Sequence, residues 1–467
     1  MLFSTFDYFL FLPLVAIGHW WLGGKGARAT WLLVASAVFY MAWNAADTLI
    51  LGWVATVGYV ASHRLGAWSE STRRRAMWGV AALMLGPLLF YKYAHFAASN
   101  VAVLVPGFEP WVPPKGHLPI GISFYSFQAL AYVLDVRRGQ APERDPIRYA
   151  TFLCFFPHLV AGPILRSHTL LAQLAQDRTL SREDVGYAMW RLGTGLLKKL
   201  LVADVLQTGI VDSVFTDPAA FTGLEVLVAL YAYTLQIYAD FSGYTDFAIG
   251  SSRLLGFHIP ENFDRPYQAT SVADYWRRWH KTLSDWVRDY VYYPLGGSRG
   301  AGLVPYRNTM VTLVILGVWH GANWTFVVYG VLHGLAVSLN RWWRKRPGWA
   351  EPRGPWALGW RWALTFQFVV IARILFRADD LGHAAQMWSA LWSRWDGLSI
   401  PRWSPHAWTV LALGYAVHFT PRAWAESART GFLSLPAPAW GLALALCGWA
   451  GVRWGVGDTL AFIYYAF

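Results

Sequence analysis

The sequence predicts an all-α, polytopic integral membrane protein with about eleven transmembrane helices and additional re-entrant or interfacial helices. Hydrophobic residues make up 55% and charged residues only 14% of the 467 positions, a balance typical of chains that fold in a bilayer. The 29 tryptophans agree with this, because amphipathic aromatic rings gather at the two membrane interfaces. No stretch has the composition of a soluble domain, so we expect one membrane domain over residues 1–467.

The charge of the chain fits membrane loops better than a nucleic-acid surface. Lys and Arg total 39 against 27 acidic residues, which gives a net charge of +12. In a polytopic protein such an excess marks loops retained at the cytoplasmic face, and we expect no nucleic-acid partner. Cys154 and Cys447 are the only cysteines, and both lie in apolar runs. The sequence therefore predicts neither a disulfide framework nor a metal site.

Five spans are predicted in the first third of the chain. They lie near residues 5–22, 30–43, 48–63, 76–93 and 118–135. The first, third and fifth connections carry ten Lys and Arg residues, whereas the second and fourth carry only Lys115. Positive loops stay in the cytoplasm, so we expect the N-terminus outside it. The first apolar run has no preceding Lys or Arg and no small-residue cleavage site, which favours a retained span over a signal peptide.

The next part of the chain has breaks and charges within apolar segments. Gly162 and Pro163 interrupt an apolar run and predict a broken or re-entrant helix. Two further spans are expected, near 186–207 and 223–239. The first contains Lys198 and Lys199, which could snorkel to an interface or attract a phosphate.

Residues 238–250, YADFSGYTDFAIG, combine acidic, hydroxyl and small side chains. Small residues let helices approach closely, and buried acids need cationic or hydroxyl partners. The pattern suits helix packing and also suits a direct role at a site, and the sequence leaves both interpretations open. Asp240 and Ser242 are the candidate site residues in this segment.

Residues 261–308 are the most charged region of the chain. Read as one helix, the pattern places an apolar stripe on one side, formed by Trp276, His280, Leu283, Val287 and Val291. Basic side chains flank the stripe, including Arg277 and Arg278, as in a helix that lies in the cytoplasmic membrane interface. His280 lies within the stripe and should point into the protein. Such a histidine is often only a hydrogen-bonded core residue, but a second buried histidine favours a functional role.

That second histidine lies in the apolar stretch 309–340, which is long enough to cross a bilayer as one helix. Ionisable side chains at membrane depth are costly, so a functional site is the default hypothesis. On an unbroken helix, His320 and His333 would be about 20 Å apart and could not share a small site. We take His320 as the candidate for chemistry and expect His333 to hydrogen-bond a neighbouring helix. Around His320 lie further polar and aromatic side chains, those of Trp319, Asn323 and Trp324.

Three more spans are expected after a basic loop, near 357–376, 406–422 and 438–452. No internal repeat is evident, which weakens the case for a transporter built from inverted halves. No Gly-x-Ser-x-Gly elbow, zinc-protease helix or nucleotide-binding motif occurs, so His280 and His320 remain as the candidate reactive groups. An imidazole can take and return a proton near neutral pH, which is what acyl transfer requires. Asn323 and Trp324 could hold the substrate or the developing oxyanion.

A series of short motifs occurs in one order along the chain. They are FYKY at 90–93, PIGISFY at 119–125, DFSGY at 240–244, YWRRWH at 275–280, RDY at 288–290, WHGA at 319–322 and FRA at 376–378. With them, and with its aromatic C-terminus, the chain resembles the membrane-bound O-acyltransferase (MBOAT) family, specifically its bacterial alginate O-acetyltransferase branch. Each motif alone is weak, but the ordered series is specific.

The resemblance implies a tunnel that joins the two membrane faces and an essential histidine at the position of His320. His320 would act as a general base or a transient acyl acceptor, and His280 would assist at the cytoplasmic entrance. The residues expected to bind substrate or to shape the tunnel are Asp240, Ser242, Trp276, Arg277, Arg278, Trp319, Asn323 and Trp324.

The resemblance also implies the donor, the partners and the location. The donor would be acetyl-CoA or an acyl carrier protein thioester on the cytoplasmic side, with no bound cofactor. Basic segments around His280 suit the phosphates of coenzyme A and the acidic surface of a carrier equally well. The expected surroundings are membrane lipid, the bacterial inner membrane, and a periplasmic acetyltransferase or polysaccharide machinery.

The sequence therefore predicts an O-acetyltransferase that acts in exopolysaccharide modification. One alternative is D-alanyl transfer to teichoic acid, a sister activity in the same family. Another is a proton-coupled transporter or permease in which His280 and His320 form a proton relay. A third is a scaffold that recruits a soluble acyltransferase.

Overall fold

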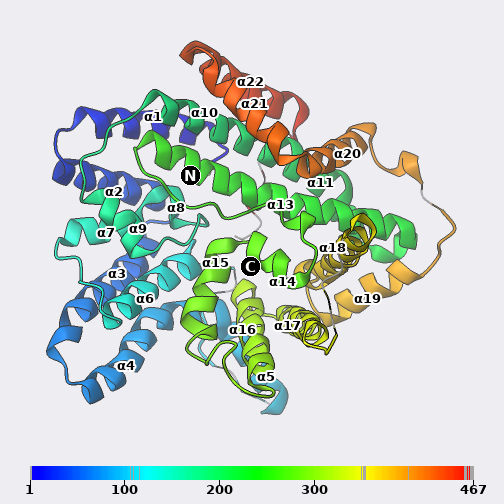
Figure 1. The fold of residues 1–467 in the computed structure, drawn as a ribbon, viewed down its shortest axis with the longest axis horizontal. Helices are drawn as coiled ribbons and strands as arrows, with labels where there is room; N and C mark the ends of the chain where they lie inside the picture. The colour runs from blue at the N-terminus through cyan, green and yellow to red at the C-terminus, as the bar shows by residue number, and fades with distance from the viewer. Residues whose placement is uncertain are drawn as a thin grey trace. The chain divides into compact units, whose positions relative to one another are not determined.

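Helices make up the regular structure of the described residues, and these contain no β-strand, as predicted (Figure 1). The computed structural model describes residues 3–105, 107–108, 110–114, 116–348, 350, 354–397, 399–456, 460 and 462. Lys115 and most of the aromatic C-terminus therefore lie outside the described residues. The chain divides into two compact units, Met1–Ala188 with Phe247–Pro260 and Met189–Asp246 with Glu261–Phe467.

The first unit is built from the N-terminal helices. They are α1 (Phe6–Trp21), α2 (Lys25–Met41), α3 (Asp47–Arg64), α4 (Glu70–Leu88), α5 (Ala94–Leu104), α6 (Ile122–Arg137), α7 (Pro146–Cys154), α8 (Phe156–Leu159) and α9 (Ser167–Leu174). Helix α2 packs on α7, and α3 packs on α6. The buried Tyr8 hydroxyl lies 2.5 Å from that of Ser251, which ties α1 to the 247–260 segment of the same unit. Each of the five predicted N-terminal spans thus corresponds to a helix.

Two continuous helical segments among the described residues are long and apolar enough to cross a membrane, judged by length and composition alone. One runs from Glu70 to Leu104, because α4 continues through a π-helical turn at Leu89–Tyr93 into α5. The other is Pro355–Arg377 in the second unit. The number of eleven spans stays a prediction.

The chain around Gly162 and Pro163 forms a broken helix, as predicted. Helix α7 ends at Cys154, α8 ends at Leu159, and the irregular backbone that follows is buried. A side chain on Gly162 would overlap the backbone of His158. The His158 Nε2 atom lies 2.9 Å from the Gln128 Oε1 atom, so this nitrogen of the buried break finds a partner within the protein.

The second unit contains the remaining helices. They are the end of α10 (Arg182–Leu196), α11 (Asp204–Leu206), α12 (Asp212–Thr216), most of α13 (Gly223–Leu254), α14 (Val272–Arg278), α15 (Lys281–Val287), α16 (Val304–His320), α17 (Trp324–Arg344), α18 (Pro355–Arg377), α19 (Leu381–Trp392), α20 (Pro405–Phe419), α21 (Arg422–Ser434) and α22 (Ala437–Trp454). Helix α13 is much longer than the span predicted at 223–239. Its hydroxyl groups bond back to carbonyls one turn earlier, as Thr245 does to Phe241, so polar residues continue the helix.

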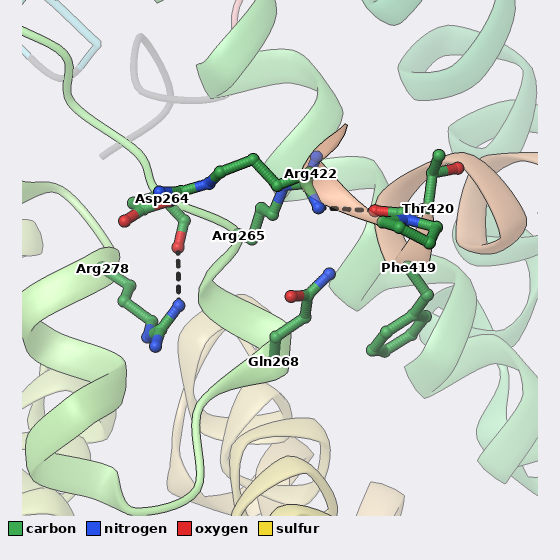
Figure 2. A pocket seen from close by; sticks show the side chains of 8 residues that line it. Asp264, Arg265, Gln268, Arg278, Phe419, Thr420 and Arg422 are labelled. Atoms are coloured by element: carbon green, nitrogen blue, oxygen red, sulfur yellow. Dashed lines mark hydrogen bonds and ion pairs between the residues drawn. The ribbon is translucent and has the colours of Figure 1, made fainter. Parts of the chain in front are cut away.

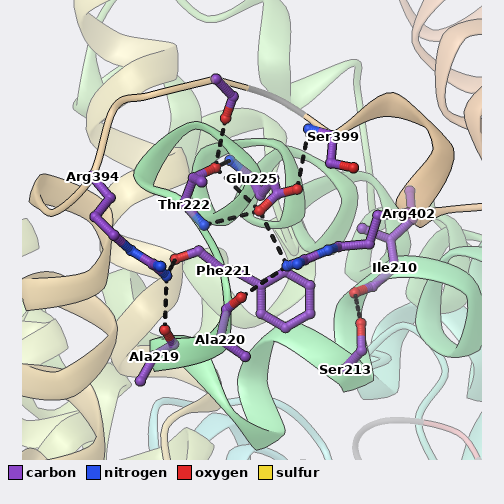
Figure 3. A network of polar contacts seen from close by, with 11 residues as sticks. Ile210, Ser213, Ala219, Ala220, Phe221, Thr222, Glu225, Arg394, Ser399 and Arg402 are labelled. Atoms are coloured by element: carbon purple, nitrogen blue, oxygen red, sulfur yellow. Dashed lines mark hydrogen bonds and ion pairs between the residues drawn. The ribbon is translucent and has the colours of Figure 1, made fainter.

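A network at the start of α13 fixes a long loop to the helix (Figure 3). Thr222 and Glu225 form a capping box, in which the Thr222 N–H donates to Glu225 Oε2 at 2.9 Å and the Glu225 N–H donates to Thr222 Oγ1 at 3.3 Å. The buried Glu225 carboxylate also accepts the Ser399 N–H and pairs with Arg402. These contacts attach the segment before α20 to the N-terminus of α13.

Candidate functional site

His320 lies at the tip of a helical hairpin. Helix α16 ends at His320, Gly321 is extended with φ −164° and ψ 152°, and α17 begins at Trp324. The predicted single span over 309–340 is therefore wrong. The Asn323 side chain accepts the Thr325 N–H and caps the new helix, which is a common start signal at this position.

Glycines allow the two helices of the hairpin to pack closely. A Cβ atom on Gly330 would lie 2.6 Å from the Leu313 carbonyl oxygen, and one on Gly317 would overlap the Phe326 carbonyl. Small residues at such contacts let helix backbones approach each other. The His320 side chain is 1% exposed as a result of this packing.

His280 also lies at a break between two helices. Helix α14 ends at Arg278 and α15 begins at Lys281, while His280 has left-handed backbone angles of φ 42° and ψ 54°. The prediction of one continuous helix through the stripe from Trp276 to Val291 is therefore wrong at this point. The prediction that His280 points into the protein is confirmed, because the residue is 0% exposed. A non-glycine residue in this conformation carries strain, and such strain is found most often at functional sites.

The indole of Trp319 lies against both histidines. Its ring centre is 5.7 Å from that of His280 and 5.2 Å from that of His320. The His320 ring further contacts Phe376 of α18, at 5.0 Å between ring centres. The fold thus brings together two buried imidazoles from separate helices around one tryptophan.

Asn262 determines which nitrogen of His280 carries a proton. The Asn262 side chain bonds the Thr282 backbone N–H at 3.2 Å, and because that group can only donate, the atom is the amide oxygen. The same oxygen lies 3.1 Å from His280 Nδ1, which must then carry hydrogen. In the neutral ring Nε2 is consequently the basic nitrogen. Burial lowers the pKa of His280 to about 3, so the imidazole is neutral at physiological pH.

His333 has a structural role. The Trp276 indole N–H donates to His333 Nδ1 at 3.2 Å, which joins α14 to α17, and the His333 ring packs on Tyr329 at 4.3 Å. The prediction that His333 bonds a neighbouring helix is confirmed. Trp276 thus orients this histidine.

Asp240 belongs to a buried network of ion pairs. Lys199 Nζ lies 3.0 Å from Asp240 and 2.8 Å from Asp204, and Lys198 Nζ lies 2.6 Å from Asp246. Both lysines are thus paired inside the unit, and neither snorkelling nor a bound phosphate is needed to explain them. Ser242 is 3% exposed, on the same helix as Asp240.

The other predicted substrate-binding residues separate into different environments. Arg277 has a side chain that is 68% exposed and pairs with Asp274. Trp324 is 49% exposed, and the Asn323 Nδ2 group donates to the Asp379 carbonyl. Arg278 also bonds Asp274, at 2.9 Å, and lines a pocket.

This arginine pocket has a volume of about 440 Å³. Its lining side chains, drawn in Figure 2, are Asp264, Arg265, Gln268, Arg278, Phe419, Thr420, Pro421 and Arg422. The only acidic lining residue, Asp264, pairs with Arg422 at 2.6 Å, whereas Arg265 donates to the Thr420 carbonyl. Arg422 pairs with Asp264 and Arg278 with Asp274, so the three guanidinium groups exceed these carboxylates by one, which makes the arginine pocket suitable for an anion.

The arginine pocket and His280 share one loop. The Asp264 N–H donates to the Arg278 carbonyl at 2.9 Å, and the Asn262 carbonyl accepts the Lys281 N–H at 2.9 Å. The segment 262–264 therefore binds the helix break on which His280 lies. The sequence pattern gave no sign of this, because the hydrogen bonds join residues 14 to 20 positions apart.

Two other neighbours of the histidines were missed from the sequence. Trp279 is 1% exposed and stacks on Tyr275, and Arg373 is 0% exposed within α18. A lone arginine inside an apolar helix is itself a signal of function, since such charges are costly in a membrane. Among the described residues, no three or more His, Cys, Asp or Glu side chains are placed to hold a metal ion.

Comparisons with known proteins agree with this architecture. The profile of the MBOAT, membrane-bound O-acyltransferase family matches residues 25–372. A Pseudomonas aeruginosa protein described as a probable alginate O-acetylase AlgI is 39% identical over 399 residues, which cover 84% of this chain and 75% of the relative. The peptidoglycan O-acetyltransferase of Helicobacter pylori is 31% identical over 428 residues, 83% of this chain and 79% of the relative. The teichoic acid D-alanyltransferase of Bacillus subtilis is 26% identical over 294 residues, 59% of this chain and 73% of the relative.

Proposed function

The chain belongs to the membrane-bound O-acyltransferase family of multi-pass membrane enzymes, and from this we propose that His280 and His320 carry out O-acetyl transfer in the modification of an extracytoplasmic polysaccharide. The observation that supports these two residues most is the packing of both buried imidazoles on Trp319. Similarity to the two O-acetylating relatives covers more of the chain, at higher identity, than similarity to the D-alanyltransferase, which favours acetyl as the transferred group.

In this proposal His320 receives the proton of the attacking hydroxyl, either directly or after brief acylation of its own ring. A neutral imidazole within hydrogen-bond reach of the nucleophile is suited to that step. His280 presents its basic Nε2 atom because Asn262 holds Nδ1, and it assists on the side from which the donor enters. Trp319 keeps the two rings apart in a dry environment, in which electrostatic stabilisation of the transition state is strongest.

The donor in this proposal is a thioester whose phosphates bind the arginine pocket. Coenzyme A and the phosphopantetheine arm of an acyl carrier protein both carry such phosphates. Support comes from the charge of the pocket and from the loop that it shares with His280. The donor binds on the cytoplasmic side of the bacterial inner membrane, and a separate periplasmic acetyltransferase completes transfer to the polymer.

The test of the histidines is acetylation in cells that depend on this chain. In a deletion strain, the wild-type chain should restore acetyl esters to the exported polysaccharide. His320→Ala and His280→Asn should not, at equal membrane abundance; asparagine tolerates left-handed backbone angles, so the second variant keeps the turn. His333→Asn is the matched control, since its amide can still accept from Trp276. Full acetylation with His320→Ala would refute the assignment.

The direction of transfer is tested with membrane vesicles of opposite orientation. Acetyl-CoA does not cross the bilayer, so radiolabelled acetyl-CoA should deliver label only when the cytoplasmic face is outside. Acetylated acyl carrier protein, supplied in parallel, distinguishes the two donors. Equal labelling in right-side-out vesicles would contradict the proposed direction.

A further inference from the structure

Arg373 is a completely buried cation that no described carboxylate neutralises. Its Nη2 group donates to the Tyr275 hydroxyl at 2.7 Å, and its guanidinium carbon lies 4.6 Å from the ring centre of Trp279 and 5.3 Å from that of Phe376. Its Nε and Nη1 groups are buried and make no hydrogen bond to a described residue. The Nε and Nη1 groups together carry three N–H hydrogens, and none of these is bonded to a described residue.

The surroundings of Arg373 compensate its charge only in part. The polar groups that interact electrostatically with it include four tyrosine hydroxyls, those of Tyr233, Tyr267, Tyr275 and Tyr329. The Tyr267 hydroxyl already donates to the Thr234 carbonyl at 2.6 Å. Aromatic faces attract a cation, but they do not replace the hydration that it has lost.

Lys199 shows how the same unit treats another buried cation. It contacts two carboxylates, those of Asp204 and Asp240. Arginine stays charged wherever it is buried, so a guanidinium left without a carboxylate is a site prepared for an anion. If Arg373 had only a packing role, an apolar residue of similar volume would stabilise the fold more than the arginine does.

The position of Arg373 identifies the anion. The Phe376 ring that lies against its guanidinium also contacts His320, at 5.0 Å between ring centres. The Trp279 ring, whose centre is 4.6 Å from the guanidinium carbon, belongs to the residue next to His280. Arg373 and His320 thus contact the same Phe376 ring, and Trp279 connects Arg373 to the segment that carries His280.

We propose that Arg373 is an anion-stabilising residue of the acyl-transfer site, where its Nε–H or Nη1–H group binds the negative charge that forms on the carbonyl oxygen of the transferred acyl group. This inference rests on the proposed function. The acceptor hydroxyl oxygen bonds to the thioester carbonyl carbon and gives its proton to a histidine, while the C=O electron pair moves to oxygen. Collapse re-forms C=O, breaks the carbon–sulfur bond and releases the thiolate, which takes the proton. The charge exists only between these two events, which explains why no permanent carboxylate opposes Arg373.

The decisive variant is Arg373→Met, which removes the charge and keeps the length of the side chain. We expect kcat for acetyl transfer to fall about 100-fold to 1,000-fold, the range for loss of one oxyanion donor, with KM for acetyl-CoA within about threefold of wild type. The melting temperature should stay equal or rise, because an uncompensated buried charge has been removed. A structural role predicts the opposite pattern, a lower melting temperature with kcat of the folded fraction unchanged.

Two further variants keep the inference testable. Arg373→Lys retains a charge without the planar fork and should lose at least tenfold in kcat; if Arg373→Met does not fold, unchanged kcat in this variant overturns the inference. Tyr275→Phe removes the hydrogen bond between the Tyr275 hydroxyl and the guanidinium, and kcat should fall by less than in Arg373→Met. His320→Ala is measured beside them. An inactive His320→Ala with fully active Arg373→Met would refute the role of Arg373 alone, whereas an active His320→Ala would refute the proposed function itself.

Discussion

The Nδ1 atom of His280 lies 3.1 Å from the Asn262 amide oxygen, and this contact sets both the tautomer and the orientation of the imidazole. The same oxygen accepts the Thr282 hydroxyl at 2.9 Å, and the Asn262 backbone carbonyl accepts the Lys281 N–H. One asparagine thus holds three consecutive residues of a strained turn. The relationship makes Asn262 a positioning residue for His280.

Asn262→Ala should lower kcat by about tenfold to hundredfold, because the His280 ring loses the acceptor that fixes its tautomer. Asn262→Asp should retain part of the activity and shift the acidic limb of the pH–rate profile upwards, since a carboxylate favours the protonated ring. Steady-state kinetics over pH measure both effects. Asn308→Ala is a matched control, because Asn308 is a buried asparagine of the same unit whose side chain bonds Leu295, Gly297 and Arg307. A similar loss of kcat in that control would indicate a general defect in folding.

The arginine pocket should determine KM for the donor. Arg265→Gln and Arg422→Gln are each expected to raise KM for acetyl-CoA about tenfold, as loss of one charge-assisted contact to phosphate would, with kcat little changed. Added salt should raise KM for acetyl-CoA more in the wild-type enzyme than in the variant that carries both substitutions. Arg277→Gln is the control, because Arg277 carries the same charge on α14 but is mostly exposed and does not line the pocket. Equal effects of all three substitutions would argue against a defined site.

His280 should make stability depend on pH. Burial lowers its pKa in the folded protein from 6.5 to about 3, so below pH 6.5 the unfolded chain binds a proton that the folded chain does not. The contribution of this histidine is therefore complete above pH 6.5 and is lost as the pH falls towards 3. By pH 4.5 the free energy of unfolding of the wild type should have fallen by about 2–3 kcal/mol more than that of His280→Asn, because each pH unit in this range contributes about 1.4 kcal/mol. Thermal melts of both proteins in detergent, at pH 7.5 and 4.5, measure the difference; parallel losses would contradict it.

The hairpin of α16 and α17 should tolerate no side chain at Gly330. Gly330→Val would place its Cβ atom 2.6 Å from the Leu313 carbonyl oxygen, so the two helices would have to separate. We expect this overpacking to lower the free energy of unfolding by about 1–3 kcal/mol. Because His320 lies at the tip of this hairpin, acetyl transfer should fall as well. Gly359→Val on α18 is the control, since a Cβ atom there meets open space. Melting temperature and transfer rate report the two consequences.

The all-α fold class, the family and the burial of the two histidines could be predicted from the amino-acid sequence alone. Apolar composition and hydrophobic periodicity are properties of short segments, and the ordered motifs are written directly in the chain. His280 was expected to point inwards from its place in an apolar stripe, and it is completely buried. The hydrogen bond of His333 to a neighbouring helix was also predicted, because a polar side chain inside apolar surroundings must find a partner.

The positions of the helix breaks, and the contacts between residues distant in the chain, could not be predicted without the folded structure. Periodicity continues through His280 and His320, since it counts side chains and does not register a left-handed residue or an extended glycine between two helices. Asn262 reaches His280 across 18 positions, and Arg373 approaches Trp279 across 94, distances over which sequence spacing carries no geometric information. A site of this kind is formed by the packing of separate helices, whereas the chemical groups that it uses are already visible in the sequence.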